Sequence, residues 1–407
     1  MYKLLYSFIV HVYHAGVCVL SAIDPKARQF CKGSRSKNWR LIPPRSVAKR
    51  IWIHASSLGE FEQGVSIIET IHSLHPSIEI FVTFFSPSGY EIRKQYELAH
   101  GVYYLPKDTP HNAAQFIEVL NPNLAIFIKY DFWLHHLQAC FNKLVPVIFV
   151  SSSFTPDHIY FKQGRPLYQK IFKQIDHFFV QDQESAQILK ANDIEHVTVA
   201  GDTRMDRVVR IATSPKRLEK MELFCSDSEV MVFGSVYEVD IQFFQGWFDA
   251  QSMKLIIAPH EIDERTITSI EKMVGAVRYS TYRGEDVNVL ILDNIGLLSD
   301  VYQYARYVYV GGGFRGALHN LLEPAAFGLP VFFKDHPNNK KFREAQDLKM
   351  SGGGFPLSTI VEFNEIFLRL NRDPDLYSQA AKASFNYINS MKGATRIVVS
   401  YIDNLLK

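Results

Sequence analysis

The stretch IWIHASSLGEFEQG, residues 51–64, is the most informative about the fold, because it passes from an apolar strand to an amphipathic helix within a few residues. Its first part holds apolar residues and one histidine, a pattern that predicts a strand buried on both faces of a sheet. Apolar residues then recur at spacings of three and four, which predicts a helix with one face on that sheet. Those residues are Phe61, Val65, Ile68, Ile71 and Leu74.

Glu60 stands at the junction of this strand and helix. One interpretation is an ordinary helix-start residue, whose negative charge offsets the positive end of the helix dipole. The other is a reacting group at the carboxyl end of a parallel strand, where open α/β sheets bind ligands. Position alone favours the first interpretation, so the choice depends on the rest of the chain.

The bulk composition indicates a folded protein with two domains. The chain has 407 residues, of which 47% are hydrophobic and 21% charged, and it is longer than one typical core requires. A formal net charge of +2 gives no global case for nucleic-acid binding. Four scattered cysteines lack metal-ligand spacing, so we expect free thiols, no disulfides and no structural zinc. No HExxH or DxD-like metal motif accompanies the turns after the apolar segments, so we expect no metal site, and we also expect no cofactor.

Strand-like and helix-like segments alternate from residue 51 onward. This alternation predicts an α/β fold with doubly wound parallel sheets in two Rossmann-like domains facing a central cleft. The predicted strands are 51–55, 78–86, 124–130, 145–151, 177–182 and 196–201 in the first series, and 230–235, 254–260, 287–293, 307–313 and 329–333 in the second. The predicted divisions are an N-terminal helix at 1–24, a first domain at 25–213, a linker at 214–228, a second domain at 229–385, and a helix at 386–407 that packs back on the first domain.

The first 23 residues are apolar and aromatic but include Lys3, His11 and His14. This pattern favours a helix lying in one leaflet of a membrane over a spanning helix, a signal peptide or an ordinary core helix. Nine basic residues and no acidic residue follow between Pro25 and Arg50, a run typical of a membrane surface or an anion site.

Two turns of the second series carry candidate phosphate-binding residues. Gly234 and Ser235 end a strand, and free N–H groups at a following helix start suit a phosphate. The segment YVGGGFRGALHNLLEP, 309–324, satisfies G-x-G-x-x-G, so a dinucleotide site is a competing interpretation. Asn320 and Glu323 lie one helical turn apart, where the carboxylate can accept ribose hydroxyls. The alternatives are a structural role for His319 and a helix irregularity at Glu323.

Three further strand ends carry charged residues. Asp131 follows one strand, and His260 with Glu261 follows another. In GDTRMDRV, residues 201–208, Arg204 and Arg207 either face an anionic ligand or pair with Asp202 and Asp206. For that segment alone, ion pairs are the favoured interpretation.

Taken in order, six motifs closely resemble the Kdo (3-deoxy-D-manno-oct-2-ulosonic acid) transferases, which are GT-B glycosyltransferases. The motifs are HASSLGE (54–60), YDFW (130–133), GDTRMDRV (201–208), FGSVYEVD (233–240), APHEID (258–263) and HNLLEPAAFGLPV (319–331). The resemblance covers about residues 51–340, and the apolar N-terminal segment matches the membrane anchor of the family.

The resemblance implies an inverting, metal-independent transfer of Kdo from CMP-Kdo to a lipid A precursor, at the cytoplasmic face of the bacterial inner membrane. It makes Glu60 the general base. The implied donor residues, held by the second domain, are Gly234, Ser235, His260, Gly311, Gly312, Gly313, His319, Asn320 and Glu323. The implied acceptor residues, held by the first domain, are Ser56, Ser57, Gly59, Asp131 and Arg204.

Several positions depart from the family pattern. Where the family has Glu-x-Glu-x-Trp-Pro, this chain has Lys129, Asp131, Trp133 and Leu134. The family's Pro-Arg-His is Pro259-His260-Glu261, so an expected arginine is missing, and our hypothesis is that His260 replaces it in part. The alternatives to Kdo transfer are another GT-B enzyme with a different nucleotide sugar, a non-catalytic membrane-docked nucleotide-binding protein, and a dinucleotide-dependent oxidoreductase.

Overall fold

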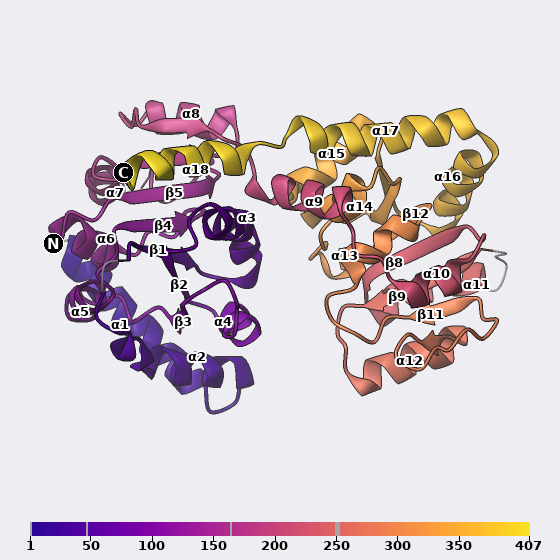
Figure 1. Cartoon of the computed structure of the whole chain (residues 1–407), viewed down its shortest axis with the longest axis horizontal. Helices are drawn as coiled ribbons and strands as arrows, with labels where there is room; N and C mark the ends of the chain where they lie inside the picture. Colours follow the sequence, from indigo (N-terminus) through magenta and orange to yellow (C-terminus); the bar gives the residue numbers. More distant parts are fainter. Residues whose placement is uncertain (1, 46–47, 163–164, 249–252) are drawn as a thin grey trace. The chain divides into compact units, whose positions relative to one another are not determined.

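The computed structural model describes residues 2–45, 48–162, 165–248 and 253–407 (Figure 1). The chain divides into two compact units, one formed by residues 1–206 with 393–407 and the other by residues 207–392. Among the described residues, each unit contains a seven-stranded sheet. All paired strands are parallel, as the alternation of strands and helices predicts.

The sheet of the first unit has the strand order β3-β2-β1-β4-β5-β6-β7. Its strands are β1 (Arg50–Ala55), β2 (Glu79–Phe84), β3 (Gly101–Tyr104), β4 (Leu124–Ile128), β5 (Val147–Ser152), β6 (His177–Val180) and β7 (Val197–Val199). Its helices are α1 (Tyr2–Leu20), α2 (Pro25–Arg35), η1 (Asn38–Leu41), α3 (Leu58–Leu74), α4 (Pro87–Arg93), α5 (Pro110–Leu120), α6 (Leu134–Asn142), α7 (Arg165–Phe172), α8 (Gln183–Lys190) and α18 (Ala394–Leu405), with the start of α9 (Thr203–Thr213).

The sheet of the second unit has the order β10-β11-β9-β8-β12-β13-β14. Its strands are β8 (Val230–Val236), β9 (Lys254–Pro259), β10 (Val277–Arg278), β11 (Val289–Ile291), β12 (Tyr307–Val310), β13 (Val331–Lys334) and β14 (Gly354–Leu357). Its helices are α10 (Glu219–Cys225), α11 (Glu238–Phe248), α12 (Glu264–Val274), α13 (Leu298–Val301), η2 (Tyr302–Tyr304), η3 (Gly313–Arg315), α14 (Leu322–Ala326), η4 (Pro337–Lys341), α15 (Arg343–Ser351), α16 (Ile360–Arg372) and α17 (Pro374–Ser390).

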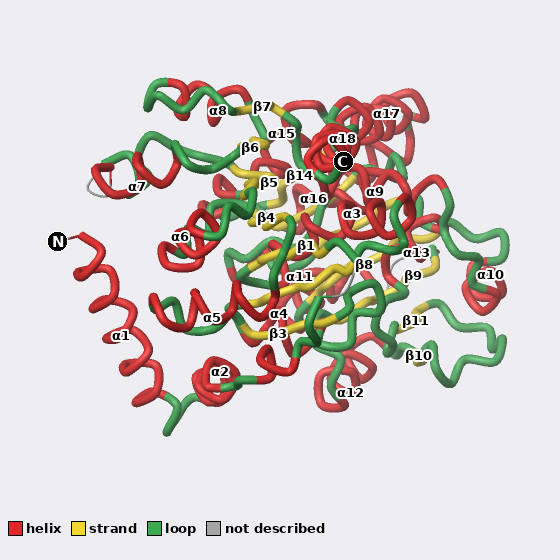
Figure 2. The backbone as a smooth tube through the Cα atoms, turned by 60° about the vertical axis from the view of Figure 1, so that its left-hand side comes forward, coloured by secondary structure: helices red, strands yellow, loops and turns green. Residues whose placement is uncertain are grey.

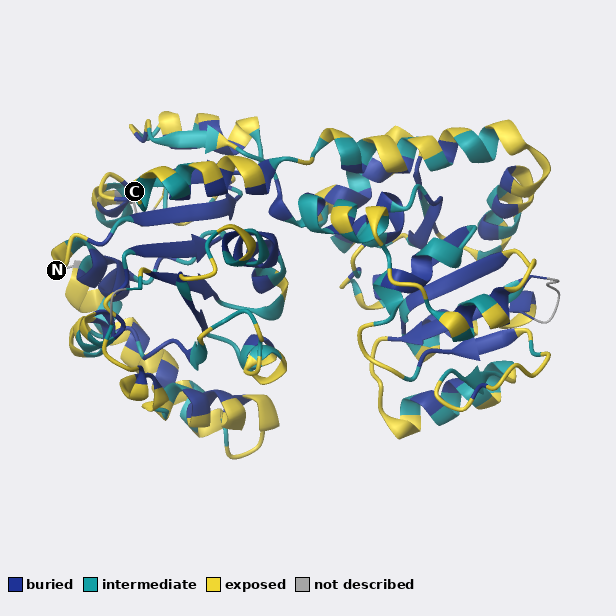
Figure 3. Ribbon diagram, viewed as in Figure 1, coloured by how far each residue is buried: buried dark blue, intermediate teal, exposed yellow. Residues whose placement is uncertain are grey.

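The strands are buried because helices cover both faces of each sheet (Figure 3). In β1, Trp52 packs into one apolar cluster with α5 and α6, while Ile51 and Ile53 pack into another with α3 and α18. Side chains of a strand point alternately to opposite faces, so a strand between two helical layers must be apolar throughout. That requirement explains why β1 is recognisable in the sequence.

Three strands lack a prediction from the sequence: β3, β10 and β14. Each lies at the edge of its sheet. Most of their residues are only partly buried, although Tyr104, Gly354 and Leu357 are buried, so none of the three strands is buried along its whole length. Partial burial makes such edge strands harder to recognise in the sequence, although the fourth edge strand, β7, is predicted.

The boundary between the units falls after Asp206, inside α9. The stretch 214–228, in which the sequence predicts a linker, belongs to the second unit and contains α10, whose Met221 and Phe224 are buried. The helix is short and polar residues flank it on both sides, which explains the polar appearance of that stretch. At the other end of the chain, α18 packs within the first unit, against α3.

Helix α1 lies along the outside of the first unit (Figure 2). It contacts the unit through a mostly polar stripe, in which the Tyr6 hydroxyl donates to Asp108 (2.6 Å) and Ser7 hydrogen-bonds His135 (2.8 Å). Of its large apolar side chains, Val10 is buried, but most are exposed. The exposed ones are Leu4, Leu5, Phe8, Ile9, Val12, Tyr13, Val19 and Leu20. By length and composition alone, residues 3–20 qualify as a membrane-crossing helix.

Candidate active site

Glu60 occupies the third position of α3 and closes a capping box with Ser57. Its Oε2 accepts hydrogen bonds from the backbone N–H groups of Ser56 (2.6 Å) and Ser57 (3.2 Å). The helix-start interpretation of Glu60 is therefore realised. No described residue donates a hydrogen bond to Oε1, so one carboxylate oxygen stays available while the other is held in place.

Burial is the main cause that raises the pKa of Glu60, to about 7, and the negative charge of Asp131 raises it further. Lys129 and the two backbone N–H groups act in the opposite direction. A helix-start carboxylate on a solvated surface has no reason for such a shift, because its charged form is favoured there. Glu60 thus combines a fixed geometry with a pKa suited to proton transfer near neutral pH.

Asp131 approaches Glu60 because β1 and β4 are neighbours in the sheet. The chain leaves β1 toward β2 on one side and returns to β4 on the other, so the β1/β4 junction is the topological switch point of the sheet. Ligands of open α/β sheets bind at such points, beyond the carboxyl ends of the strands. Glu60 and Asp131 therefore lie at the place where the topology of the sheet predicts that a ligand binds.

His54 fixes the wall of this site. Its Nε2 accepts from the Trp133 indole N–H (2.8 Å), and its Nδ1 hydrogen-bonds the Thr83 hydroxyl (2.9 Å). Because an indole N–H can only donate, Nε2 carries no proton and His54 is neutral. Burial also lowers the pKa of His54. The Asp131 Oδ2, 3.6 Å from that Nε2, is buried and has no hydrogen-bond partner among the described residues.

The segment 201–208 serves mainly to hold the first unit together. Thr203 Oγ1 donates to the Gln63 carbonyl of α3 and hydrogen-bonds Ser151 of β5. Arg204 pairs with Asp202, with its Nη2 at 2.6 Å from the carboxylate, as the ion-pair interpretation requires. Asp206 accepts from the N–H groups of Gly393 (2.6 Å) and Thr395 (2.7 Å), and so caps α18.

In the second unit the switch point lies between β8 and β12. Gly234 and Ser235 fall inside β8, and a Cβ at Gly234 would lie 2.3 Å from the Tyr302 hydroxyl. A Cβ at Gly311 would lie 2.5 Å from the Ser235 carbonyl oxygen, so the two strand ends touch at backbone level. At the start of α11, the Asp240 carboxylate accepts a hydrogen bond from the Tyr237 N–H (2.9 Å).

The glycine run does not form a dinucleotide fingerprint. That motif needs a helix to open directly on the glycines. Here Gly311–Gly313 lead into the short 3₁₀ turn η3, and α14 begins only at Leu322. Gly312 has φ +91°, and a Cβ there would lie 2.4 Å from the Ala317 carbonyl oxygen. The glycines instead fold the chain back so that His319 comes close to Gly312.

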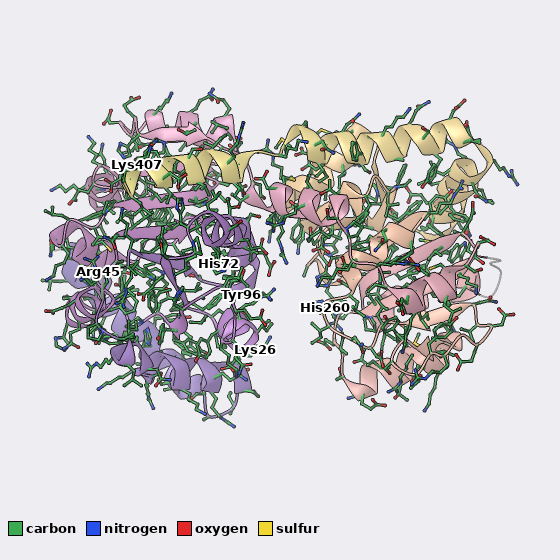
Figure 4. The ribbon with its side chains drawn as sticks, in the orientation of Figure 1. Lys26, Arg45, His72, Tyr96, His260 and Lys407 are labelled. Atoms are coloured by element: carbon green, nitrogen blue, oxygen red, sulfur yellow. The ribbon has the colours of Figure 1, made fainter. Side chains whose placement is uncertain are left out.

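His319 and His260 stack with ring centroids 4.1 Å apart. His260, labelled in Figure 4, follows β9, and Tyr237 adjoins both rings, at 5.0 Å from His260 and 5.6 Å from His319. Burial, then His260 and Arg315, lowers the pKa of His319 to about 4. Burial also lowers the pKa of His260. Both rings are therefore neutral at neutral pH.

Asn320 and Glu323 lie together at the start of α14, as the sequence predicts. The Asn320 amide donates to Glu323 Oε1 (3.1 Å), and its Oδ1 accepts from the Leu322 N–H (3.0 Å). Burial raises the pKa of Glu323, while the nearby positive charge of Arg207 lowers it. Arg207 thus acts on Glu323, a contact that spacing along the sequence does not reveal.

The structure adds four residues to the two sites: His54 and Lys129 near Glu60, and Tyr237 and Arg315 near His319. All four lie inside the quoted motifs and segments or one residue from them, but only the strand order brings them together. Among the described residues, no group of three or more His, Cys, Asp or Glu side chains is arranged to hold a metal ion.

The chain has two α/β units, each with a parallel sheet and a topological switch point at which a ligand can bind. This architecture is the GT-B fold. Solved structures agree. A UDP-GlcNAc 2-epimerase from Neisseria meningitidis aligns with a TM-score of 0.59 at 14% identity, over 87% of this chain and 100% of that one. MurG from Acinetobacter baumannii aligns with a TM-score of 0.53 at 13% identity, over 88% and 99%.

The sequence comparisons find similarity to one family. The family model of 3-deoxy-D-manno-octulosonic-acid transferase (kdotransferase) matches residues 29–207. The 3-deoxy-D-manno-octulosonic acid transferase of Aquifex aeolicus is 25% identical over 79% of this chain and 87% of its own length. Those of Chlamydia trachomatis serovar A and Haemophilus influenzae are 27% and 24% identical, over 70% and 73% of this chain and 69% and 72% of their own. The resemblance to the Kdo transferases, a family of glycosyltransferases, is confirmed.

Proposed function

We propose that this chain transfers Kdo from CMP-Kdo to a lipid A precursor in lipopolysaccharide biosynthesis, with inversion at the transferred sugar and with Glu60 as general base. The observation that carries the proposal is the state of Glu60. One of its oxygens is fixed by two backbone N–H groups, the other has no partner among the described residues, and its pKa is raised to about 7.

The proposed reaction needs a base that takes a proton from the acceptor substrate, and a group that stabilises the leaving CMP. The acceptor hydroxyl attacks the anomeric carbon of Kdo and gives its proton to Glu60 Oε1. The bond between that carbon and the phosphate oxygen breaks, and its electron pair stays with CMP. A carboxylate with a pKa near the working pH is an efficient base for such a step. Lys129 and Asp131 set that pKa from opposite directions.

We assign the donor to the second unit. Glu323 and Asn320 would hold the ribose of the nucleotide, because the carboxylate can accept both hydroxyls. A Cβ at Gly234, Gly311, Gly312 or Gly313 would clash with neighbouring protein atoms. The phosphate is assigned to the backbone N–H groups of these two turns, including that of Ser235. His260 and His319 line the same region as neutral rings.

We assign the acceptor to the first unit, around Ser56, Ser57, Gly59 and Asp131. Arg204 is left out, because its guanidinium pairs with Asp202. Aromatic contacts connect this region with the outside of the unit: Tyr13 of α1 packs on Phe85 (6.0 Å), and Phe85 packs on Trp133 (4.7 Å). A lipid-linked acceptor would find apolar surface along this path.

The membrane contact is assigned to α1 and α2 at the cytoplasmic face of the inner membrane. The exposed apolar side chains of α1 would enter the lipid, while the basic residues of α2 would meet anionic headgroups. The partners would then be CMP-Kdo, the lipid A precursor and the membrane surface.

The test is release of CMP from CMP-Kdo by the full chain, with and without a tetra-acylated lipid A precursor. Release that depends on the acceptor is expected. If UDP or GDP binds more tightly than CMP, a different nucleotide sugar is the donor. A non-catalytic protein would release no CMP under either condition, and turnover of a nicotinamide cofactor would indicate an oxidoreductase.

A further inference from the structure

The guanidinium of Arg315 places a positive charge at the β8/β12 switch point. Its guanidinium carbon lies 3.7 Å from the centroid of the Tyr237 ring, so the planar group stacks on the ring. Tyr237 follows β8 and Arg315 follows β12. The pair therefore bridges the two strand ends between which an open α/β sheet binds its ligand.

The backbone holds this arrangement in place. Arg315 ends η3 between Gly312 (φ +91°) and Gly316 (φ +63°), so the turn needs two left-handed residues. Its N–H donates to the Gly312 carbonyl (3.1 Å). The contact between Gly311 and the Ser235 carbonyl joins this turn to the one that carries Tyr237. The Arg315 side chain is thus exposed to solvent, and the η3 turn fixes the position of its backbone.

Other polar groups nearby are suited to different roles. Lys334 Nζ donates to the carbonyls of Leu357 (3.1 Å) and Ser358 (2.9 Å), and Arg207 lies near Glu323. The two stacked histidines are neutral, and the Nε2 of His319 is buried without a hydrogen-bond partner among the described residues. A buried nitrogen of this kind usually receives its partner from a ligand or water.

We propose that Arg315 binds the phosphate of the nucleotide and takes the place of the arginine that is missing after Pro259. This inference rests on the proposed function. The guanidinium presents several N–H donors in one plane, which matches the oxygens of a phosphate, and stacking on Tyr237 fixes that plane. When the sugar leaves, the phosphate oxygen keeps the electron pair of the broken bond, and the positive charge of Arg315 stabilises it. His260 then contributes a stacking surface and no charge.

The experiment compares the binding of CMP and of cytidine to the full chain by calorimetry. The variants are Arg315→Gln, Arg315→Lys and, as a matched control, Arg283→Gln, which removes an exposed arginine of the same unit. We expect Arg315→Gln to weaken CMP binding by on the order of 10- to 100-fold, the usual effect of losing a charged hydrogen bond. Cytidine binding stays unchanged, Arg315→Lys recovers part of the loss, and Arg283→Gln binds CMP as wild type does.

Three results would overturn the inference. If Arg315→Gln binds CMP as wild type does, Arg315 does not hold the phosphate, while the proposed function stands. If cytidine binding falls as much as CMP binding, the side chain supports the site as a whole rather than the phosphate. If wild type binds no nucleotide, the proposed donor and the inference fail together. If wild type prefers UDP or GDP, the proposed donor fails alone, and the same comparison with that nucleotide and its nucleoside decides on Arg315.

Discussion

Glu60 and Asp131 stand beyond β1 and β4 of the first unit, whereas Tyr237 and Arg315 stand beyond β8 and β12 of the second. Both pairs occupy the switch point of a seven-stranded parallel sheet. The first point gathers carboxylates beside a neutral histidine, and the second gathers a guanidinium beside two neutral histidines. The same topology thus offers a place for a ligand twice, and we propose that the side chains make the first place a proton acceptor and the second an anion site.

The two points also differ in how they are built. Glu60 is held by hydrogen bonds from the backbone to its side chain. The β8/β12 point is held by glycines that let two strand ends touch. Side-chain changes should therefore act most strongly at the first point, and backbone changes at the second.

The largest effect is expected for Glu60→Gln. The amide can still serve in a capping box but accepts no proton, so the fold should persist while the acceptor-dependent rate falls by about 10²- to 10⁴-fold. Steady-state release of CMP measures the loss. Glu118→Gln, which alters an exposed residue of α5, is the control. Full activity in Glu60→Gln would return Glu60 to a purely structural role.

Gly312→Ala should destabilise the second unit by about 1–3 kcal/mol, since the residue has a left-handed backbone and its new methyl group would meet the Ala317 carbonyl. Chemical denaturation of the full chain measures the change. Gly246→Ala is the matched control: it lies in α11 with open space around the added methyl group, so it should leave stability equal or slightly higher. Equal stability of the two variants would contradict the backbone contact.

Asp206→Ala should cost about 1 kcal/mol, the usual value of a lost helix cap. The variant removes the acceptor of the Gly393 and Thr395 N–H groups and so loosens α18. Hydrogen exchange of the amides in α18 measures it, and Asp206→Asn, which keeps an acceptor, should retain most of the protection. Unchanged protection in Asp206→Ala would show that packing on α3 alone holds the helix.

A smaller effect is expected in the pH profile. Glu60 must be ionised to accept a proton, so the rate should fall as the pH falls through the pKa of about 7. Asp131→Asn removes a charge that raises this pKa, so the acid limb should move to lower pH. Lys129→Gln removes a charge that lowers it, so the limb should move to higher pH. Shifts of the same sign in both variants would contradict the assigned electrostatics.

The central strands and the position of Glu60 follow from the sequence, because a strand covered on both faces must be apolar and a helix start must carry a cap. Three of the four edge strands, β3, β10 and β14, do not follow, since partial exposure leaves their composition less constrained. The proximity of Asp131 to Glu60, and of Arg315 to Tyr237, depends on which strands are neighbours. The spacing of residues along the chain does not reveal the order of the strands in the sheet.

The most direct test of the account measures two quantities, the affinity for CMP and the single-turnover rate with acceptor, in wild type, Glu60→Gln and Arg315→Gln. The account predicts that Glu60→Gln binds CMP normally and transfers slowly, while Arg315→Gln binds CMP weakly. It would be contradicted if Glu60→Gln lost CMP affinity or kept its transfer rate, because the proton and the phosphate would then not be handled by separate switch points.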